Sequence, residues 1–149
     1  MTSRVQDGVT VGYWTETKMT TPNQSSHRVL LVSGDPASRN SLKPTLESVL
    51  LEVELVSQAD AALELLKNES FGLVIVDASL PRLDALELLR EMRRSHASIL
   101  RRTIVLVNPH DPICEKILPL EPCHMLERLP LRHQLIHAVS DCLRQQESS

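Results

Sequence analysis

Three short, uninterrupted aliphatic runs constrain the fold of this chain more than any other feature of its sequence. They are residues 29–32, 73–76 and 104–107, and each is followed by a polar residue. Strands that are apolar on both faces are typical of parallel sheets covered by helices on each side. Shorter runs at 53–56 and 125–126 add two further candidates. The sequence therefore predicts five buried parallel strands.

Helical segments are expected between these runs. They cover residues 35–50, 61–66, 83–94, 113–118 and 131–143. Asp35 and Pro36 suit the start of the first helix, and Pro44 is expected to kink or divide it. Strands that alternate with helices predict an α/β, doubly wound sheet, in which functional residues gather at the carboxyl ends of the strands. The positions at these ends are Ser33, Gly34, Asp35, Asp77, Asn108, Leu129 and Pro130.

Composition narrows the class of protein further. The chain has 149 residues, a formal net charge of −3 and one residue each of Phe, Trp and Tyr. This length suits one domain, and the acidic balance argues against nucleic acid as a partner. The sequence lacks an apolar run long enough for a signal peptide or a membrane span, which predicts a cytoplasmic protein without membrane contact.

The three cysteines are widely spaced and odd in number. Cys114, Cys123 and Cys142 include no CxxC pair, so they are expected to be reduced, small hydrophobic residues. His133 and His137 have the spacing of one helix face and could share a metal with Cys142, but ordinary surface or packed histidines are the stronger expectation. We therefore predict no metal site.

The N-terminal segment differs in composition from the rest. Residues 1–27 are rich in Ser and Thr and are expected to form a flexible arm, with a weak strand candidate at 9–14. A sharper alternative is that Tyr13 and Trp14 dock on the domain or on a partner. The domain itself is expected to span 28–145, followed by a tail at 146–149.

Residues 72–89 resemble the third-strand motif of bacterial response-regulator receiver domains. In that family an aliphatic strand ends on a phospho-accepting aspartate, with a proline four residues later, and Asp77 and Pro81 match. The first strand at 29–32 and the second helix at 62–66 are also similar to the family. The resemblance covers 28–145 and implies a flavodoxin-like (βα)5 fold with strand order 2-1-3-4-5.

The departures from the family pattern concern its phosphotransfer chemistry. They are Ser33, Gly34, Asn108 and Leu129. The family closes its first strand with two adjacent acids that hold magnesium, where this chain has Ser33 and Gly34, and its conserved lysine falls on Leu129. Asp35 is expected to cap the following helix instead. Arg128, one residue before the lysine position, is expected to turn its side chain to the opposite face.

The resemblance and these departures together imply a degenerate receiver, or pseudo-receiver. Such a module is not an enzyme, needs no cofactor and acts through protein–protein contact, with Asp77 as the phosphoacceptor equivalent. One alternative is a single-domain response regulator that a histidine kinase phosphorylates on Asp77 with magnesium. A second is a flavodoxin-like small-molecule binder. The expected partner is a histidine kinase, another signalling protein or a second copy of the chain, bound through the last helices and the strand between them.

Overall fold

The computed structural model describes residues 27–80 and 84–148. The expected arm, its strand candidate at 9–14 and Pro81 lie outside the described residues. Among the described residues, no helix has both the length and the apolar character needed to cross a membrane.

The centre of the domain is a five-stranded sheet. Its strands are β2 (Arg28–Val32), β3 (Glu52–Val56), β4 (Leu73–Asp77), β5 (Thr103–Val107) and β6 (His124–Glu127). All neighbouring strands pair in parallel, in the spatial order β3-β2-β4-β5-β6. This is the predicted order 2-1-3-4-5, and it puts the end of β4 at the middle of the sheet.

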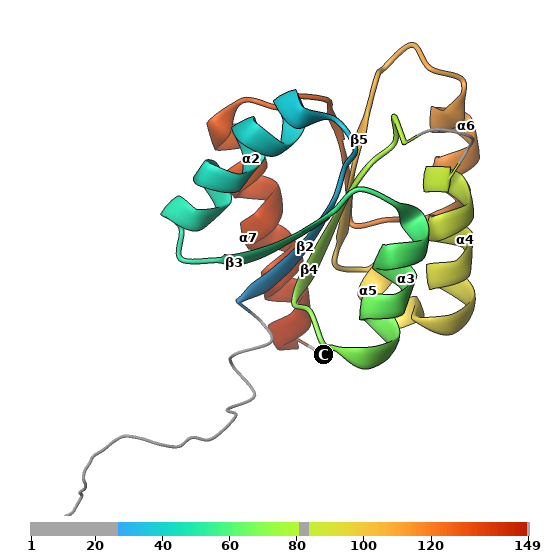
Figure 1. Ribbon diagram of the computed structural model, residues 1–149, viewed down its shortest axis with the longest axis horizontal. Coiled ribbons are helices and arrows are strands. Elements are labelled where there is room, and N and C mark those ends of the chain that lie inside the picture. Colours follow the sequence, from blue (N-terminus) through green and yellow to red (C-terminus); the bar gives the residue numbers. More distant parts are fainter. Residues whose placement is uncertain (1–26, 81–83, 149) are drawn as a thin grey trace, which may run out of the picture.

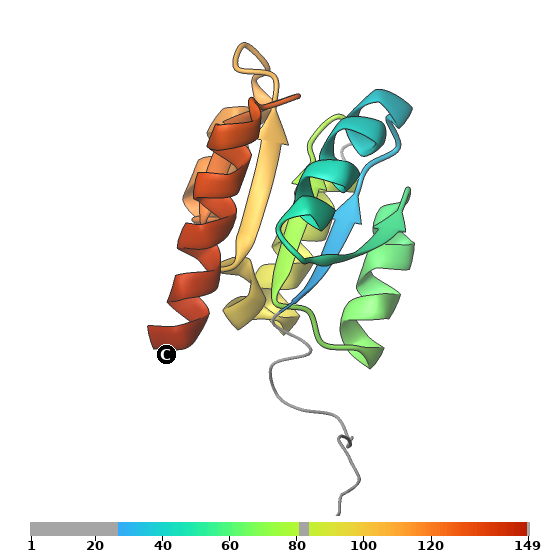
Figure 2. The ribbon, with the colours of Figure 1, turned by 90° about the vertical axis from the view of Figure 1, so that its left-hand side faces the viewer.

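Helices cover both faces of the sheet (Figures 1 and 2). They are α2 (Pro36–Ser48), α3 (Ala59–Asn68), α4 (Asp84–Ser95), α5 (Ala97–Leu100), α6 (Ile113–Ile117) with the 3-10 turn η2 (Leu118–Leu120), and α7 (Arg132–Ser148). Helices α2 and α7 lie on one face, and α3, α4, α5 and α6 lie on the other. The predicted α/β, doubly wound sheet is confirmed.

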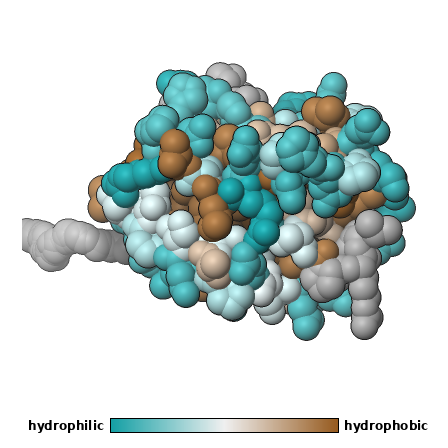
Figure 3. All heavy atoms as spheres, turned by 90° about the horizontal axis from the view of Figure 1, so that it is seen from above, coloured by the Kyte–Doolittle hydropathy of each residue, from teal (hydrophilic) through white to brown (hydrophobic). Residues whose placement is uncertain are grey.

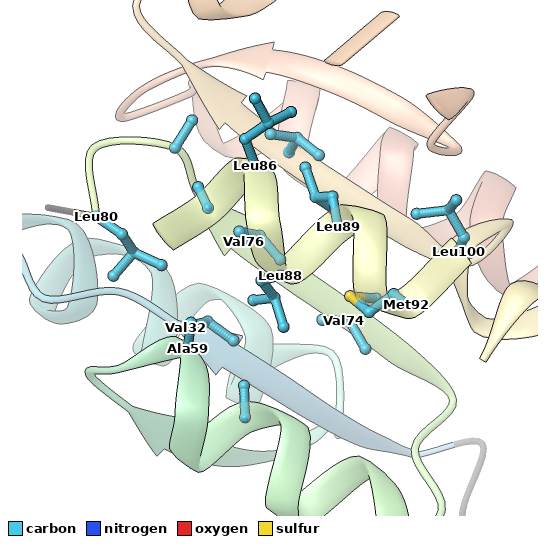
Figure 4. Close-up of a cluster of buried hydrophobic side chains, with 14 of the residues drawn as sticks. Val32, Ala59, Val74, Val76, Leu80, Leu86, Leu88, Leu89, Met92 and Leu100 are labelled. Carbon is cyan, nitrogen blue, oxygen red and sulfur yellow. The ribbon is translucent and has the colours of Figure 1, made fainter. Parts of the chain in front are cut away.

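Strand alternation divides the core into two clusters. Val74 and Val76 of β4 face α4, where they pack with Leu88, Leu89 and Met92 in the cluster of Figure 4. The intervening residues of β4 face α2 and α7, where the buried residues are Val29, Leu31, Leu42, Leu46, Leu51, Leu73, Ile75, Ile104, Leu106, Leu135, Ala138, Val139 and Cys142. Successive side chains continue to point to opposite faces just beyond the strand ends. This alternation therefore determines which polar residues come together at the edge of the sheet.

Three local expectations need correction. Pro44 does not divide the first helix, because α2 continues from Pro36 to Ser48 with Pro44 inside it. The sequence reading missed the short helix α5, whose four residues are too few to show a periodic pattern. Helix α7 continues beyond Leu143 to Ser148, so residues 146–148 are helical and do not form a separate tail.

The expectation of three reduced cysteines was wrong. Cys123, immediately before β6, forms a disulfide with Cys142 of α7, and their Cα atoms are 6.2 Å apart. That separation lies within the range that disulfides require. The pairing could not be seen in the sequence, because the two cysteines are 19 residues apart and only the packing of α7 beside β6 brings them together.

Candidate functional site

The carboxyl ends of the parallel strands meet at one edge of the sheet, which Figure 3 views from above. Ser33 follows β2, Asp77 ends β4 and Arg128 follows β6. By strand alternation, Ser33 has the orientation of Leu31, Asp77 that of Ile75, and Arg128 that of Leu126. All three side chains therefore emerge toward the face covered by α2 and α7, next to the start of α2.

Asp77 is a fully buried carboxylate, with 0% of its surface exposed. Its Oδ1 atom accepts hydrogen bonds from the Ser79 backbone N–H at 3.0 Å and the Ser79 hydroxyl at 2.8 Å. Its Oδ2 atom accepts one from the Ser33 hydroxyl at 2.9 Å. A buried charge without such partners costs several kcal/mol, so these donors are what allow the carboxylate to remain inside.

The Arg128 guanidinium supplies the positive charge for this carboxylate. Its Nε atom lies 3.1 Å from Asp77 Oδ1, and its Nη2 atom donates to Asp77 Oδ2 at 3.4 Å. The same Nη2 atom donates to Asp35 Oδ2 and, at 3.2 Å, to the Ser38 hydroxyl. Arg128 thus links both carboxylates of the site.

The prediction that Arg128 faces away from the site was wrong. The Arg128 backbone N–H donates to the Val107 carbonyl at 2.9 Å, so the strand ladder extends through this residue. Counting by twos from the inward-facing Leu126 brings the side chain of Arg128 to the face of Asp77. Leu129 then leaves the sheet with a left-handed φ of 56° and is half exposed.

Asp35 has the capping role that the sequence predicts, together with a second one. Its Oδ1 atom accepts the Ala37 N–H at 3.1 Å at the start of α2. Its Oδ2 atom accepts the hydroxyl of the buried Ser38 at 3.2 Å and pairs with Arg128. The Ala37 N–H, then Ser38 and Arg128, lower the pKa of Asp35 below its ordinary value, and partial burial opposes them.

Two of the other expected positions lie outside this network. Asn108 is exposed after β5, and its Oδ1 atom accepts the His110 N–H at 3.4 Å. Gly34 is exposed, and a Cβ atom at this position would meet the Ser57 carbonyl at an ordinary 3.6 Å. Steric crowding therefore does not require glycine here, and a larger residue would fit at position 34.

Sequence reasoning missed three members of the network: Arg128, Ser38 and Ser79. Ser79 was detectable, because an aspartate commonly accepts hydrogen bonds from the residue two positions later. Arg128 was detectable by counting the alternation from the β6 core residues. Ser38 had no comparable signal, since its burial depends on how α2 packs against the sheet.

The fold and the site together define a class of protein. A five-stranded parallel sheet in the order 2-1-3-4-5, with a carboxylate at the end of its middle strand, has the architecture of a receiver domain. The model of the response regulator receiver domain family matches residues 29–116, which is more than half of the chain. The chain belongs to this family, whose members are signalling modules of two-component systems.

Individual relatives agree with this assignment. The chain is 32% identical over 94 residues to the response regulator MprA of Mycobacterium sp. strain KMS, covering 63% of this chain and 40% of that protein. It is 29% identical over 121 residues to the transcriptional regulatory protein FixJ of Bradyrhizobium diazoefficiens, covering 80% of this chain and 58% of that protein. The chain therefore spans between 40% and 58% of the length of these relatives.

Solved structures show the same fold. A signal receiver domain of an HD domain-containing protein from Pseudomonas fluorescens Pf-5 is 26% identical, with a TM-score of 0.72 and coverage of 82% of this chain and 98% of that one. A CheY-like receiver domain protein from Methanospirillum hungatei has a TM-score of 0.73 at 24% identity, with coverage of 81% and 96%. The latter comparison supports the fold alone.

Magnesium, the ion used by receiver domains, does not fit this site as the residues stand. Mg²⁺ requires oxygen ligands in near-octahedral geometry and is usually held by one or two carboxylates with waters. The only carboxylates in the described network are Asp35 and Asp77, and the Arg128 guanidinium already lies between them. A divalent cation would have to displace this arginine or share the carboxylates with a like charge a few ångströms away.

Proposed function

We propose that this chain is a degenerate receiver domain that signals through protein–protein contact without phosphorylation of Asp77. In this proposal Arg128 takes over the charge balance that a metal ion and a lysine provide in other receivers. The domain then stays in one electrostatic state, and its output depends on what it binds and not on a phosphoryl group. We further propose a cytoplasmic protein whose partner is a histidine kinase, another signalling protein or a second copy of itself.

The observation that carries the proposal is that both carboxylate oxygens of Asp77 are already occupied by hydrogen-bond donors. Both of its carboxylate oxygens accept hydrogen bonds, both lie beside Arg128, and the side chain is fully buried. Attack on a phosphoryl donor requires an exposed lone pair aligned with the phosphorus atom. Reaching that geometry would break the buried ion pair between Arg128 and Asp77, and the Asp77 carboxylate would then lose its positive partner.

The charges around the acceptor support the same conclusion. Phosphoryl transfer places negative charge on three equatorial oxygens, and catalysis consists largely of neutralising that charge. The site contributes one guanidinium against two carboxylates, so its formal charge is already negative before a phosphoryl group arrives. Ser33 and Gly34, at the end of β2, carry no negative charge that could help to hold a metal ion.

Exposed apolar side chains support a protein partner at the end of the chain. Leu118, Leu129 and Leu131 are each more than half exposed, and all three lie between α6 and the start of α7. Single exposed leucines are ordinary on a protein surface, but Leu129 and Leu131 lie two positions apart after β6 and favour a contact surface there, whereas Leu118 lies before β6, at its other end. This is the region through which the family resemblance leads us to expect binding.

A second candidate function is favoured by the relatives and by the survival of Asp77. In that case the domain is a response regulator that a histidine kinase phosphorylates on Asp77. Incubation of the full chain with acetyl phosphate and magnesium, followed by intact-mass measurement, separates the two functions. We expect no phosphoryl adduct on the wild-type chain.

The control variants are Asp77→Asn and Asp111→Asn. Asp111 is an exposed carboxylate whose Oδ1 atom accepts the Ile113 N–H at the start of α6, outside the Arg128 network. An adduct on wild type that persists in Asp111→Asn and disappears in Asp77→Asn would contradict the proposal and establish the phosphorylated receiver.

A further inference from the structure

The disulfide at the start of β6 lies beside another potential metal ligand, the His124 imidazole. Cys123, His124 and Cys142 each offer one ligand atom, and these three atoms lie within 4.8 Å of one another. They belong to the amino-terminal end of β6 and to α7, whereas Arg128 follows the other end of β6. The cluster is therefore separate from the Asp77 site.

From this cluster we propose that the reduced form of the protein binds one zinc ion through the Cys123 and Cys142 thiolates and the His124 imidazole. Zinc prefers sulfur and nitrogen ligands in tetrahedral geometry, with Zn–S distances of about 2.3 Å and Zn–N distances of about 2.0 Å. Those bond lengths separate neighbouring ligand atoms by about 3.5–3.8 Å. The three atoms lie within 4.8 Å of one another while the disulfide is formed, so after reduction only side-chain rotation is needed to bring them to this spacing in the proposed site.

A carboxylate holds one ring nitrogen of His124, as is common for metal-ligating histidines, and this leaves Nδ1 as the nitrogen that would bind the metal. Its Nε2 atom lies 3.0 Å from Asp141 Oδ2, and Asp141 directly precedes Cys142 in α7. Carboxylates that hold one ring nitrogen orient the ring and increase its basicity toward a metal. A disulfide alone requires only the two sulfur atoms, so the imidazole and its carboxylate are the features that point to a metal.

The proposed ligands differ in burial, so that one is fixed in the core and the others are open to an incoming ion. Cys142 is fully buried against the α2 and α7 side of the core, while Cys123 and His124 are partly exposed. The buried thiol fixes one ligand, and the exposed side admits the ion and a fourth ligand such as water. The other thiol, Cys114, lies by Asn108, where its Sγ atom is 3.5 Å from the Asn108 carbonyl oxygen.

The disulfide and the metal are alternative states of the same two sulfur atoms. A phosphine reductant transfers two electrons to the S–S bond, takes up the oxygen of water as phosphine oxide, and leaves two thiols. Zinc then binds the two thiolates with release of two protons. Metal binding is consequently restricted to the reduced protein.

The test uses the full chain, either reduced by a phosphine and freed of metal or left oxidised. Cobalt(II) is titrated as a spectroscopic probe, and zinc is added to displace it. The reduced wild type should bind one equivalent with thiolate-to-cobalt charge-transfer absorption, and zinc should abolish that absorption. The oxidised wild type should bind none.

Variants assign the ligands. Cys123→Ser should abolish the charge-transfer absorption, His124→Ala should weaken binding at least tenfold, and Asp141→Asn should weaken it about tenfold or more because the imidazole loses its orienting partner. Cys114→Ser is the matched control and should bind as wild type does. Because His124 and Cys123 are partly exposed, circular dichroism of these variants should report an intact fold.

Several results would overturn the proposal. These are a reduced wild type that binds no cobalt or zinc, a His124→Ala variant that binds as tightly as wild type, or loss of binding in Cys114→Ser. Equal binding by the oxidised protein would also overturn it, because the sulfur atoms of a disulfide are not available as thiolates.

Discussion

Arg128 supplies the positive charge beside the buried Asp77 carboxylate. Replacing it with alanine would leave the buried Asp77 carboxylate without its positive partner. We expect Arg128→Ala to lower the free energy of unfolding by about 3 kcal/mol, as is typical when one partner of a buried ion pair is removed. Urea denaturation followed by circular dichroism measures this loss.

Arg144→Ala is the matched control for this experiment. Arg144 also pairs with an aspartate, Asp141, but its side chain is 66% exposed, so the loss should be much smaller. Equal effects of the two substitutions would mean that the Arg128 pair is only an ordinary surface contact.

Asp35 gives the site a dependence on pH. Its pKa is lowered from an unfolded value near 3.8, first by the Ala37 N–H and then by Ser38 and Arg128. The stabilisation from the ionised group is therefore fully present above pH 3.8 and is lost as the pH falls through the lower folded pKa. Asp35→Asn should flatten the decrease in unfolding free energy as the pH falls below about 4. A variant with the same acid profile as wild type would show that the Asp35 contacts do not form in solution.

These residues also show what a sequence can and cannot predict about a site. The position of Asp77 and the capping role of Asp35 can be predicted locally, because the residues next to them indicate where a strand ends and where a helix starts. Arg128 was misplaced because the lysine position of the family was taken as the reference instead of the alternation within β6. Ser38 depends on packing between α2 and the sheet, which sequence spacing does not encode.

Among the elements, α2 is followed by a residue in an unfavourable conformation, two positions after its last helical residue. Leu50 has a φ of 67° and is 83% exposed. Its N–H donates to the Glu47 carbonyl at 3.0 Å, and the Leu51 N–H donates to the Leu46 carbonyl at 3.2 Å, which is the Schellman pattern that usually has glycine at this position. Leu50→Gly should therefore raise the free energy of unfolding by about 0.5–1 kcal/mol.

The comparison for this prediction is Leu118→Gly. Leu118 is 61% exposed, but its φ of −51° suits any residue, so glycine should destabilise the protein there. Thermal unfolding of both variants tests the difference in sign. Destabilisation by both substitutions would contradict the assignment of strain to Leu50.

Elements were predicted well where the pattern was strong and poorly where it was short. The five strands and their order follow from continuous aliphatic runs and from the resemblance to receivers. Helix α5 was missed because four residues cannot display a helical period. Pro44 was expected to interrupt α2. The helix is continuous through Pro44, and Leu42 and Leu46 on either side of it pack into the core.

For the whole molecule, the disulfide joins the last strand to the last helix. Closing a segment with a sequence separation of 19 reduces the entropy of the unfolded chain. Reduction in metal-free buffer should lower the free energy of unfolding by about 3 kcal/mol in the chain-entropy model. Urea denaturation with and without a phosphine reductant measures this, with Cys114→Ser expected to show the same loss as wild type. An unchanged midpoint on reduction would show that the bond does not form in solution.

The central claim is that Arg128 occupies the electrostatic role of a metal ion at Asp77. Nuclear magnetic resonance titration of the full chain with magnesium and then beryllofluoride, which mimics a phosphoryl group, tests it most directly. The amide signals of Asp77 and Ser79 should not shift in wild type, because the Arg128 guanidinium already pairs with the carboxylate and the Ser33 and Ser79 donors already occupy its two oxygens. Saturable shifts of these two signals in the wild-type protein would contradict the account.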